Sequence, residues 1–148
     1  MKSFSLILFL ALSFAFAPSY SLLEQEKQAF EATNTYRAKK NRDPLELDTF
    51  LCRLAREHSE RMASGKTRFG HDGFDKRVKK IEKNLGTGSV AENVFMASYE
   101  ADGNEAVEEW IDSPGHRKNL LNKSYKRVGL GMASGKNGTF YTQIFCDE

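Results

Sequence analysis

The 148-residue sequence lacks an excess of charge of either sign, an internal repeat and, after its first twenty residues, any long apolar run. Its 22 basic and 20 acidic residues leave a formal net charge of +2, and such a balance gives no electrostatic footprint for nucleic acid. Without a second apolar segment, the mature chain has no candidate transmembrane anchor. Eleven phenylalanines and five tyrosines argue against disorder. We therefore expect a folded, soluble monomer.

The amino terminus is typical of a secretory signal peptide. Met1 and Lys2 supply a positive start, residues 4–17 are apolar apart from two serines, and small residues follow. The run is shorter than the ~20 residues that span a bilayer. Cleavage after Ala17 or after Ser21 fits the pattern. We favour Ser21, which leaves residues 22–148 as one secreted, extracellular domain.

Cysteine is scarce, with Cys52 and Cys146 alone in the chain. Behind a secretory leader, a disulfide between them is expected. In the chain-entropy model, closing so long a loop stabilises a fold by roughly 4–5 kcal/mol. The alternative is two unpaired cysteines on different elements.

The pattern of apolar residues predicts helices first and a β-hairpin last. Helices are expected over 23–40, after caps at Asp48, Asp72 and Asn104, and briefly after Ser113-Pro114. Residues 89–97 read as strand-like, Asn137-Gly138 signals a hairpin turn, and residues 140–146 are apolar on both faces. Since helices must then cover both faces, we expect an α+β fold with the sheet as its middle layer.

Three histidines and one inward carboxylate are the candidates for chemistry. His58 lies on the apolar side of its helix, as a packed, hydrogen-bonded core histidine would. His71 precedes a helix, and His116 falls near the third position of a short one, where the helix terminus disfavours imidazolium and leaves the neutral ring that a metal or a base requires. Glu92 stands inside an apolar segment, which is costly unless the carboxylate is paired. We hypothesise that His71, His116 and Glu92 form one cluster.

A basic stripe follows the helix expected after Asp72. It consists of Lys76, Lys79, Lys80 and Lys83. The stripe could touch an anionic surface, but a solvated helix face is the simpler interpretation.

Short motifs occur in a fixed order along the chain. They are Asn34-Thr35-Tyr36-Arg37, residues 44–48 (PLELD), His58-Ser59, Phe69-Gly70-His71, residues 91–94 (AENV), residues 110–121 (WIDSPGHRKNLL) and residues 128–131 (VGLG). Together they resemble the CAP superfamily, or sperm-coating-protein (SCP) domain, which includes cysteine-rich secretory, venom-allergen and pathogenesis-related proteins. The resemblance covers nearly the whole mature chain and is strongest to the short variety common in bacteria.

The resemblance implies a three-layer α-β-α sandwich with a small antiparallel central sheet and a cleft. In longer members, two histidines and two glutamates line that cleft and can hold zinc. His71 and His116 match the histidines, and Glu92 matches the first glutamate. Ser113 stands where the second glutamate would be, so the set is incomplete. Asn119 completes the expected cleft residues. Substitutes for the missing carboxylate could be Asp112, Glu108 or Glu109, although helical spacing turns all three toward solvent.

Three functional hypotheses follow from the resemblance and the residues. The favoured one is a non-enzymatic, secreted binding module for a lipid or sterol, a cell-wall component or another protein, since no nucleophile motif is present. The alternative is a zinc-dependent hydrolase or peptidase in which His71 and His116 hold the metal and Glu92 deprotonates its water. The third is a cluster that only ties loops to the sheet.

Overall fold

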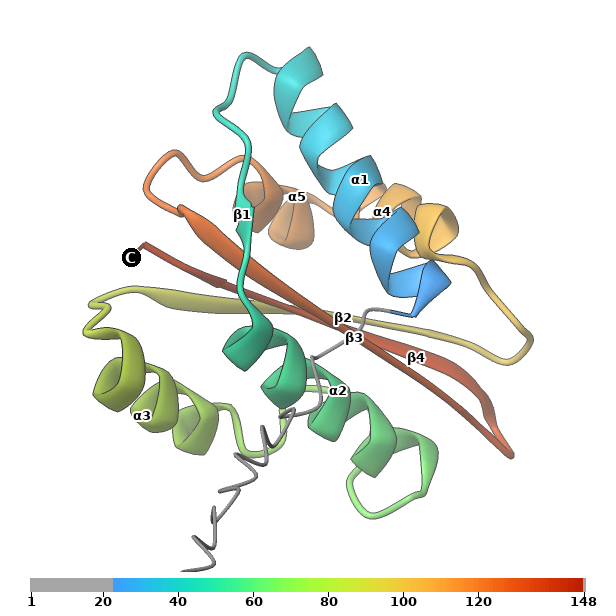
Figure 1. Cartoon of the computed structure of the whole chain (residues 1–148). Coiled ribbons are helices and arrows are strands. Elements are labelled where there is room, and N and C mark those ends of the chain that lie inside the picture. The colour runs from blue at the N-terminus through green and yellow to red at the C-terminus, as the bar shows by residue number, and fades with distance from the viewer. Residues whose placement is uncertain (1–22, 148) are drawn as a thin grey trace, which may run out of the picture.

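The computed structural model describes residues 23–147, so the leader expected at residues 1–21 lies outside the described residues. In chain order, the elements are α1 (Glu24–Lys39), β1 (Glu46–Leu47), α2 (Thr49–Ala63), α3 (Phe74–Leu85), β2 (Val90–Ala97), α4 (Gly103–Asp112), α5 (Pro114–Leu120), β3 (Arg127–Gly135) and β4 (Gly138–Cys146) (Figure 1). Within residues 23–147, no helix has the length and apolar character to cross a bilayer.

The strands form one four-stranded sheet in the order β1-β3-β4-β2. β4 pairs antiparallel with β3 on one side and with the whole of β2 on the other. β1 pairs parallel with β3, so the sheet is mixed rather than purely antiparallel. The sequence analysis missed β1 because two residues carry no alternation signal. β2 is an edge strand of the sheet, and the candidate site lies beside it.

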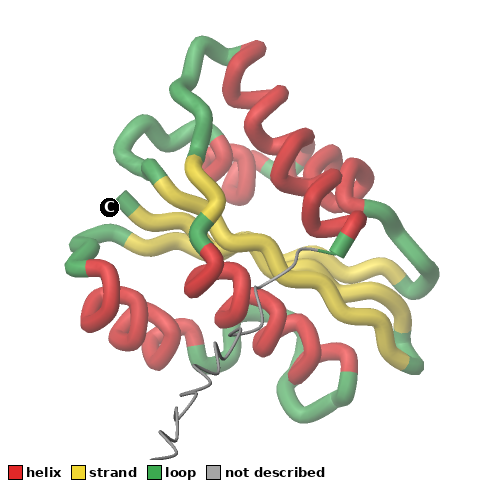
Figure 2. The backbone as a smooth tube through the Cα atoms, viewed as in Figure 1, coloured by secondary structure: helices red, strands yellow, loops and turns green. Residues whose placement is uncertain are grey.

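Helices cover both faces of the sheet, as the apolar character of β4 predicts (Figure 2). α1, α4 and α5 lie on one face, and α2 and α3 lie on the other. Consecutive residues of β4 enter different cores: Phe145 packs with Trp110 and Leu130 under the first layer, whereas Ile144 packs with Leu51 and Ile81 under the second. This is the α-β-α sandwich expected from the sequence.

The edge of β2 is covered by α4. The Trp110 indole N–H, which is fully buried, donates to the carbonyl oxygen of Val94 at 3.1 Å. A buried indole usually finds such a partner. The hydrogen bond fixes α4 against the edge strand and satisfies a carbonyl that has no neighbouring strand.

The predicted helix starts are partly confirmed. Asp48 caps α2, because its Oδ1 accepts from the backbone N–H of Phe50 and Leu51 at 2.8 and 2.9 Å. The caps predicted at Asp72 and Asn104 are wrong. α3 begins after Gly73, whose φ of +77° suits glycine, and Asp102 caps α4. Single-residue cap signals are ambiguous where several polar residues stand together.

The short helix begins where the sequence predicts it, and the hairpin turn is shifted by one residue. β3 and β4 are joined by the two-residue turn Lys136-Asn137, one residue earlier than expected, with Gly135 opposite Gly138. Ser113 is the N-cap of α5 and Pro114 is its first residue.

The small residues of β3 bring α2 into backbone contact with the sheet. A Cβ on Gly131 would lie 2.0 Å from the backbone nitrogen of Arg56, and one on Gly129 would lie 2.3 Å from the carbonyl carbon of Leu51. Both separations are far below van der Waals contact. Glycine is therefore required because α2 crosses β3 at a distance that no side chain tolerates.

Within the described residues 23–147, the structure shows no disulfide linking Cys52 to Cys146, and both side chains are buried. The Cys52 sulfur accepts a hydrogen bond from the backbone N–H of Leu130, whereas Cys146 lies opposite Arg127, three residues further along β3. The two side chains are therefore placed at different points along β3. Burial raises the pKa of the Cys52 thiol to about 11, which keeps it protonated and unreactive.

Gly131→Ala tests the close crossing of α2 and β3. We expect the free energy of unfolding to fall by about 2–3 kcal/mol, because the added methyl group forces the backbones apart. Gly88→Ala is the matched control, since a Cβ there meets nothing within 4 Å. Urea denaturation measures both. Equal stability of the two variants would contradict the crossing.

Candidate functional site

The candidate site is built around Glu92, a buried carboxylate on β2. Glu92 pairs with Ile144 of β4 and so faces the layer of α2 and α3. Its side chain accepts three charge-assisted hydrogen bonds. Two come from the Arg77 guanidinium, from Nε to Oε2 at 2.7 Å and from Nη2 to Oε1 at 2.8 Å, and the third joins His71 Nδ1 to Oε1 at 2.9 Å. A buried charge needs such a complete set of partners.

Arg77 anchors α3 to this carboxylate. It lies on the inward face of α3, one turn before Ile81, and is largely buried. Its remaining terminal nitrogen donates to the carbonyl oxygen of Asp72 at 3.0 Å, so the same guanidinium also holds the loop that carries His71. The sequence analysis missed Arg77, although a cation one helical turn from an apolar inward residue is a usable signal for a partner of an inward acid.

His71 stands in the loop between α2 and α3, with its ring half-exposed. Because its Nδ1 is bonded to Glu92, only Nε2 is directed away from the carboxylate. The preceding Gly70 has a φ of +136°, which favours glycine. Its carbonyl oxygen accepts from His58 Nε2 at 2.8 Å. The loop is therefore pinned on both sides of the His71 ring.

His58 is the packed, hydrogen-bonded core histidine that its helical position predicts. It is 1% exposed on α2. Its Nε2 lies 3.9 Å from Oε1 of Glu92, so it also belongs to the surroundings of the site, which the sequence analysis did not foresee. Burial, followed by the nearby Arg77 charge, lowers the pKa of His58 below its ordinary value, and the ring is neutral.

His116 approaches from the opposite layer, at the third position of α5. Burial is the main cause that lowers its pKa, and the neighbouring His71 lowers it further. Its ring is accordingly neutral, as the sequence analysis expected, although the stated cause differs from the helix terminus invoked there. The segments that carry the two histidines both bond to β2, His71 through Glu92 and the His116 backbone through Asn93. The loop from one layer and α5 from the other reach around the same edge.

Asn119, expected as a cleft residue, positions α5. Its Nδ2 donates to Oδ1 of Asn93 at 2.8 Å, and Asn93 donates in turn to the His116 carbonyl oxygen at 3.3 Å and to Gln143 at 3.1 Å. Asn93 follows Glu92 on β2 and therefore faces the other layer. The two neighbouring residues thus place the two histidine-bearing segments, one from each side of the sheet.

The remaining expected cleft residues contribute little to a ligand set. Ser113 joins α4 to α5 and is partly buried, with no side-chain capping bond. The three acids considered as substitutes for the missing glutamate, Glu108, Glu109 and Asp112, are all exposed. Within residues 23–147, no three His, Cys, Asp or Glu side chains gather into a metal-binding group. The structure offers two imidazoles and one engaged carboxylate.

Comparison of the sequence with known proteins identifies a family and two bacterial relatives. The profile of the cysteine-rich secretory protein (CAP) family matches residues 30–145. The uncharacterized protein YkwD of Bacillus subtilis (strain 168) is 33% identical over 135 residues, covering 87% of this chain and 49% of that protein. The uncharacterized membrane protein YlbC of the same strain is 36% identical over 125 residues, covering 81% and 34%. The chain therefore spans half or less of these relatives.

A solved structure extends the likeness to three dimensions. An extracellular protein containing an SCP domain from Bacillus anthracis str. Ames superimposes with a TM-score of 0.69 at 29% identity, over 88% of this chain and 45% of that one. With the family profile matched over most of its length, the chain belongs to the CAP family.

Arg77→Met tests the role of the guanidinium in the buried cluster. We expect the free energy of unfolding to fall by about 3–5 kcal/mol, because Glu92 is left as an uncompensated buried charge. The double variant Arg77→Met/Glu92→Gln should recover part of that loss, since no buried charge remains. Denaturant titration measures both variants. A single variant as stable as the wild type would show that Glu92 does not depend on Arg77.

Proposed function

We propose that the chain is a secreted, non-enzymatic binding module of the CAP family whose histidine pair holds a divalent metal. The burial and hydrogen bonding of the Glu92 carboxylate are the observations that favour a non-enzymatic role. Its two oxygens accept three hydrogen bonds from Arg77 and His71, and the side chain is buried. A carboxylate fixed in this way orients a histidine. A general base must instead reach the water whose proton it takes.

The number of metal ligands also argues against hydrolysis. Catalytic zinc usually has three protein ligands and one open position. Here Ser113 replaces the third candidate, and the neighbouring acids on α4 are exposed. The zinc-hydrolase alternative would need Glu92 to act both as the partner of Arg77 and as the base.

The donor set fits a metal held by two imidazoles. Metal-bound histidines typically donate their other ring N–H to a carboxylate, which fixes the tautomer and the ring orientation. His71 has this arrangement through Nδ1 and Glu92. The lowered pKa of His116 leaves its ring neutral, as a metal ligand must be. A bound Zn²⁺ would supply a Lewis-acidic point for a polar ligand group, and this chain's own residues would orient the two rings.

The groove between α1 and α4 is the feature that favours an organic ligand with an apolar part. It has a volume of about 360 Å³. Its lining combines apolar side chains with polar and charged ones: Ala32, Tyr36, Val107 and Ile111 beside Glu31, Thr35, Lys39, Asn104 and Glu108. This volume is in the range of small-molecule sites, and the mixed lining suits a ligand that has both an apolar and a polar part. Of the ligand classes considered, a lipid or sterol with a polar head fits best. A wall component or a protein is the alternative ligand class.

An extracellular location agrees with the relatives. The Bacillus anthracis neighbour is described as an extracellular protein, and the leader-like residues 1–21 fit export. YlbC is described as a membrane protein, and its length beyond the matched region leaves room for other parts.

Zinc titration of the purified protein tests the histidine pair. We expect His71→Ala and His116→Ala each to weaken zinc binding by about tenfold or more, since loss of even an outer-shell partner typically costs 10–100-fold. Lys118→Ala is the control, an exposed residue on the same helix as His116. Calorimetry and metal analysis give the affinities. Equal zinc content in the wild type and in the three variants would show that the histidine pair holds no metal.

Filling the groove tests the ligand class. Ala32→Phe should abolish binding of a fluorescent fatty acid or sterol, because the larger ring occupies the space between α1 and α4. Ala38→Phe is the control, since Ala38 is exposed on the same helix and is not among the groove residues. Binding by the wild type, with loss only in Ala32→Phe, is the expected result. Peptide hydrolysis that needs zinc and disappears in Glu92→Gln would contradict the non-enzymatic assignment.

A further inference from the structure

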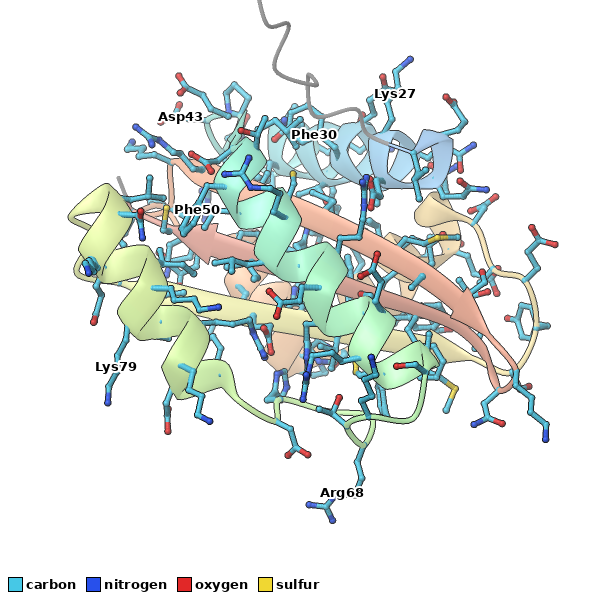
Figure 3. The ribbon with its side chains drawn as sticks, turned by 60° about the horizontal axis from the view of Figure 1, so that its bottom comes forward. Lys27, Phe30, Asp43, Phe50, Arg68 and Lys79 are labelled. Atoms are coloured by element: carbon cyan, nitrogen blue, oxygen red, sulfur yellow. The ribbon has the colours of Figure 1, made fainter. Side chains whose placement is uncertain are left out.

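The turn that joins β3 to β4 carries an asparagine followed by a glycine. Lys136 and Asn137 form the turn, Gly138 begins β4, and the turn stands at the end of the sheet away from the C-terminus (Figure 1, Figure 3). The sequence analysis interpreted Asn137-Gly138 as a turn signal alone. Asparagine is also chemically labile, because the backbone nitrogen of the next residue can attack its side-chain amide, most readily where that residue has no side chain.

The Asn137 side chain is exposed and unrestrained. Within residues 23–147, no group forms a hydrogen bond or an ion pair with it. Five other asparagines are held by side-chain hydrogen bonds, namely Asn34, Asn84, Asn93, Asn119 and Asn122. In the same part of the chain, Asn41 and Asn104 precede Arg42 and Glu105, whose side chains hinder the attacking nitrogen. Asn137 therefore combines a free amide with an unhindered neighbour.

Packing requires glycine at position 138. Its φ is +119°, and a Cβ there would lie 1.8 Å from the Ala97 carbonyl oxygen. A larger residue would therefore have to adopt a strained backbone and push the hairpin away from the end of β2. The fold thus keeps a glycine directly after Asn137, and the reactive nitrogen has no side chain to shield it.

The attack needs the turn to open, and the structure confines that opening to a few residues. Gly138 pairs with Gly135 in the last rung of the β3–β4 ladder, and the frayed ends of an element open at little cost in free energy. The next residue, Thr139, is 1% exposed, and its hydroxyl donates to the Tyr99 carbonyl oxygen at 2.9 Å. The rest of the hairpin therefore stays folded while the Gly138 nitrogen reaches the Asn137 amide.

We propose that Asn137 is a deamidation site, at which the folded protein converts an amide into a carboxylate without a catalyst. The Gly138 nitrogen forms a bond to Cγ of Asn137 and loses its proton, the Cγ–NH₂ bond breaks, and the NH₂ group leaves with that proton as ammonia. Water then opens the resulting cyclic imide. Hydrolysis at Cγ gives aspartate, and hydrolysis at the backbone carbonyl carbon gives isoaspartate, in which the chain continues through Cγ.

The products change the turn in two ways. Each adds a negative charge next to Lys136. Isoaspartate also lengthens the backbone by one carbon immediately before Gly138, which is tightly packed against Ala97. We expect the isoaspartate form to lose the last rung between β3 and β4. It should be cut more readily by proteases at the turn, because proteolysis follows local opening.

Timed incubation of the full chain, folded and in urea, tests the proposal. Samples in neutral and mildly alkaline buffer are digested and mapped by mass spectrometry, which detects the replacement of NH₂ by OH at each asparagine. We expect the folded protein to be modified at Asn137 several-fold faster than at Asn104 or Asn122. The reaction should be faster in alkaline buffer, since the attacking nitrogen must lose a proton. An Asn137 that changes only in urea, or no faster than the other two, would overturn the proposal.

Two variants locate the reaction. Asn137→Gln retains an amide but would have to close a larger ring, so the turn should stay unmodified and resistant to proteases. Lys123→Gly places a glycine after Asn122, whose Oδ1 accepts from the Ser124 N–H at 2.9 Å. We expect this second pair to react more slowly than Asn137, because its side chain is held. Equal rates at the two pairs, or an unchanged gain of carboxylate at the turn of Asn137→Gln, would refute the assignment.

Discussion

The buried carboxylate of Glu92 is the constraint around which this side of the molecule is arranged. An anion inside a sheet-helix interface is stable only with partners on every side. Arg77 and His71 supply them, and each partner belongs to a different segment. Through Arg77 the carboxylate fixes the register of α3, and through His71 it fixes the loop after α2. One carboxylate therefore holds two separate segments in place.

The position of β2 at the sheet edge explains how two layers contribute to one site. Glu92 faces one layer and Asn93 faces the other, since neighbouring strand residues alternate. Asn93 holds α5 through Asn119 and the His116 carbonyl oxygen. In a central strand the same residues would face two separated cores. At an edge, the segments that they hold can meet.

Much of the fold was predictable from the sequence, because it depends on local patterns. The cap at Asp48, the hairpin and the two-sided burial of β4 follow from residues near one another in the chain. The inward position of Glu92 was equally visible. Its main partner was not, because Arg77 lies among several lysines and only the packing of α3 separates it from them. The disulfide was predicted from compartment and cysteine number alone, and these say nothing of where Cys52 and Cys146 lie along β3.

The way α4 covers β2 has a consequence for how copies of this domain behave when crowded together. Sheets with open edges recruit strands from other molecules and aggregate. Here one edge strand has only two residues, and the other has its Val94 carbonyl oxygen occupied by the Trp110 indole. The first edge is therefore short, and the second has α4 fixed against its middle. Both features reduce the length of sheet edge at which neighbouring copies could exchange strands.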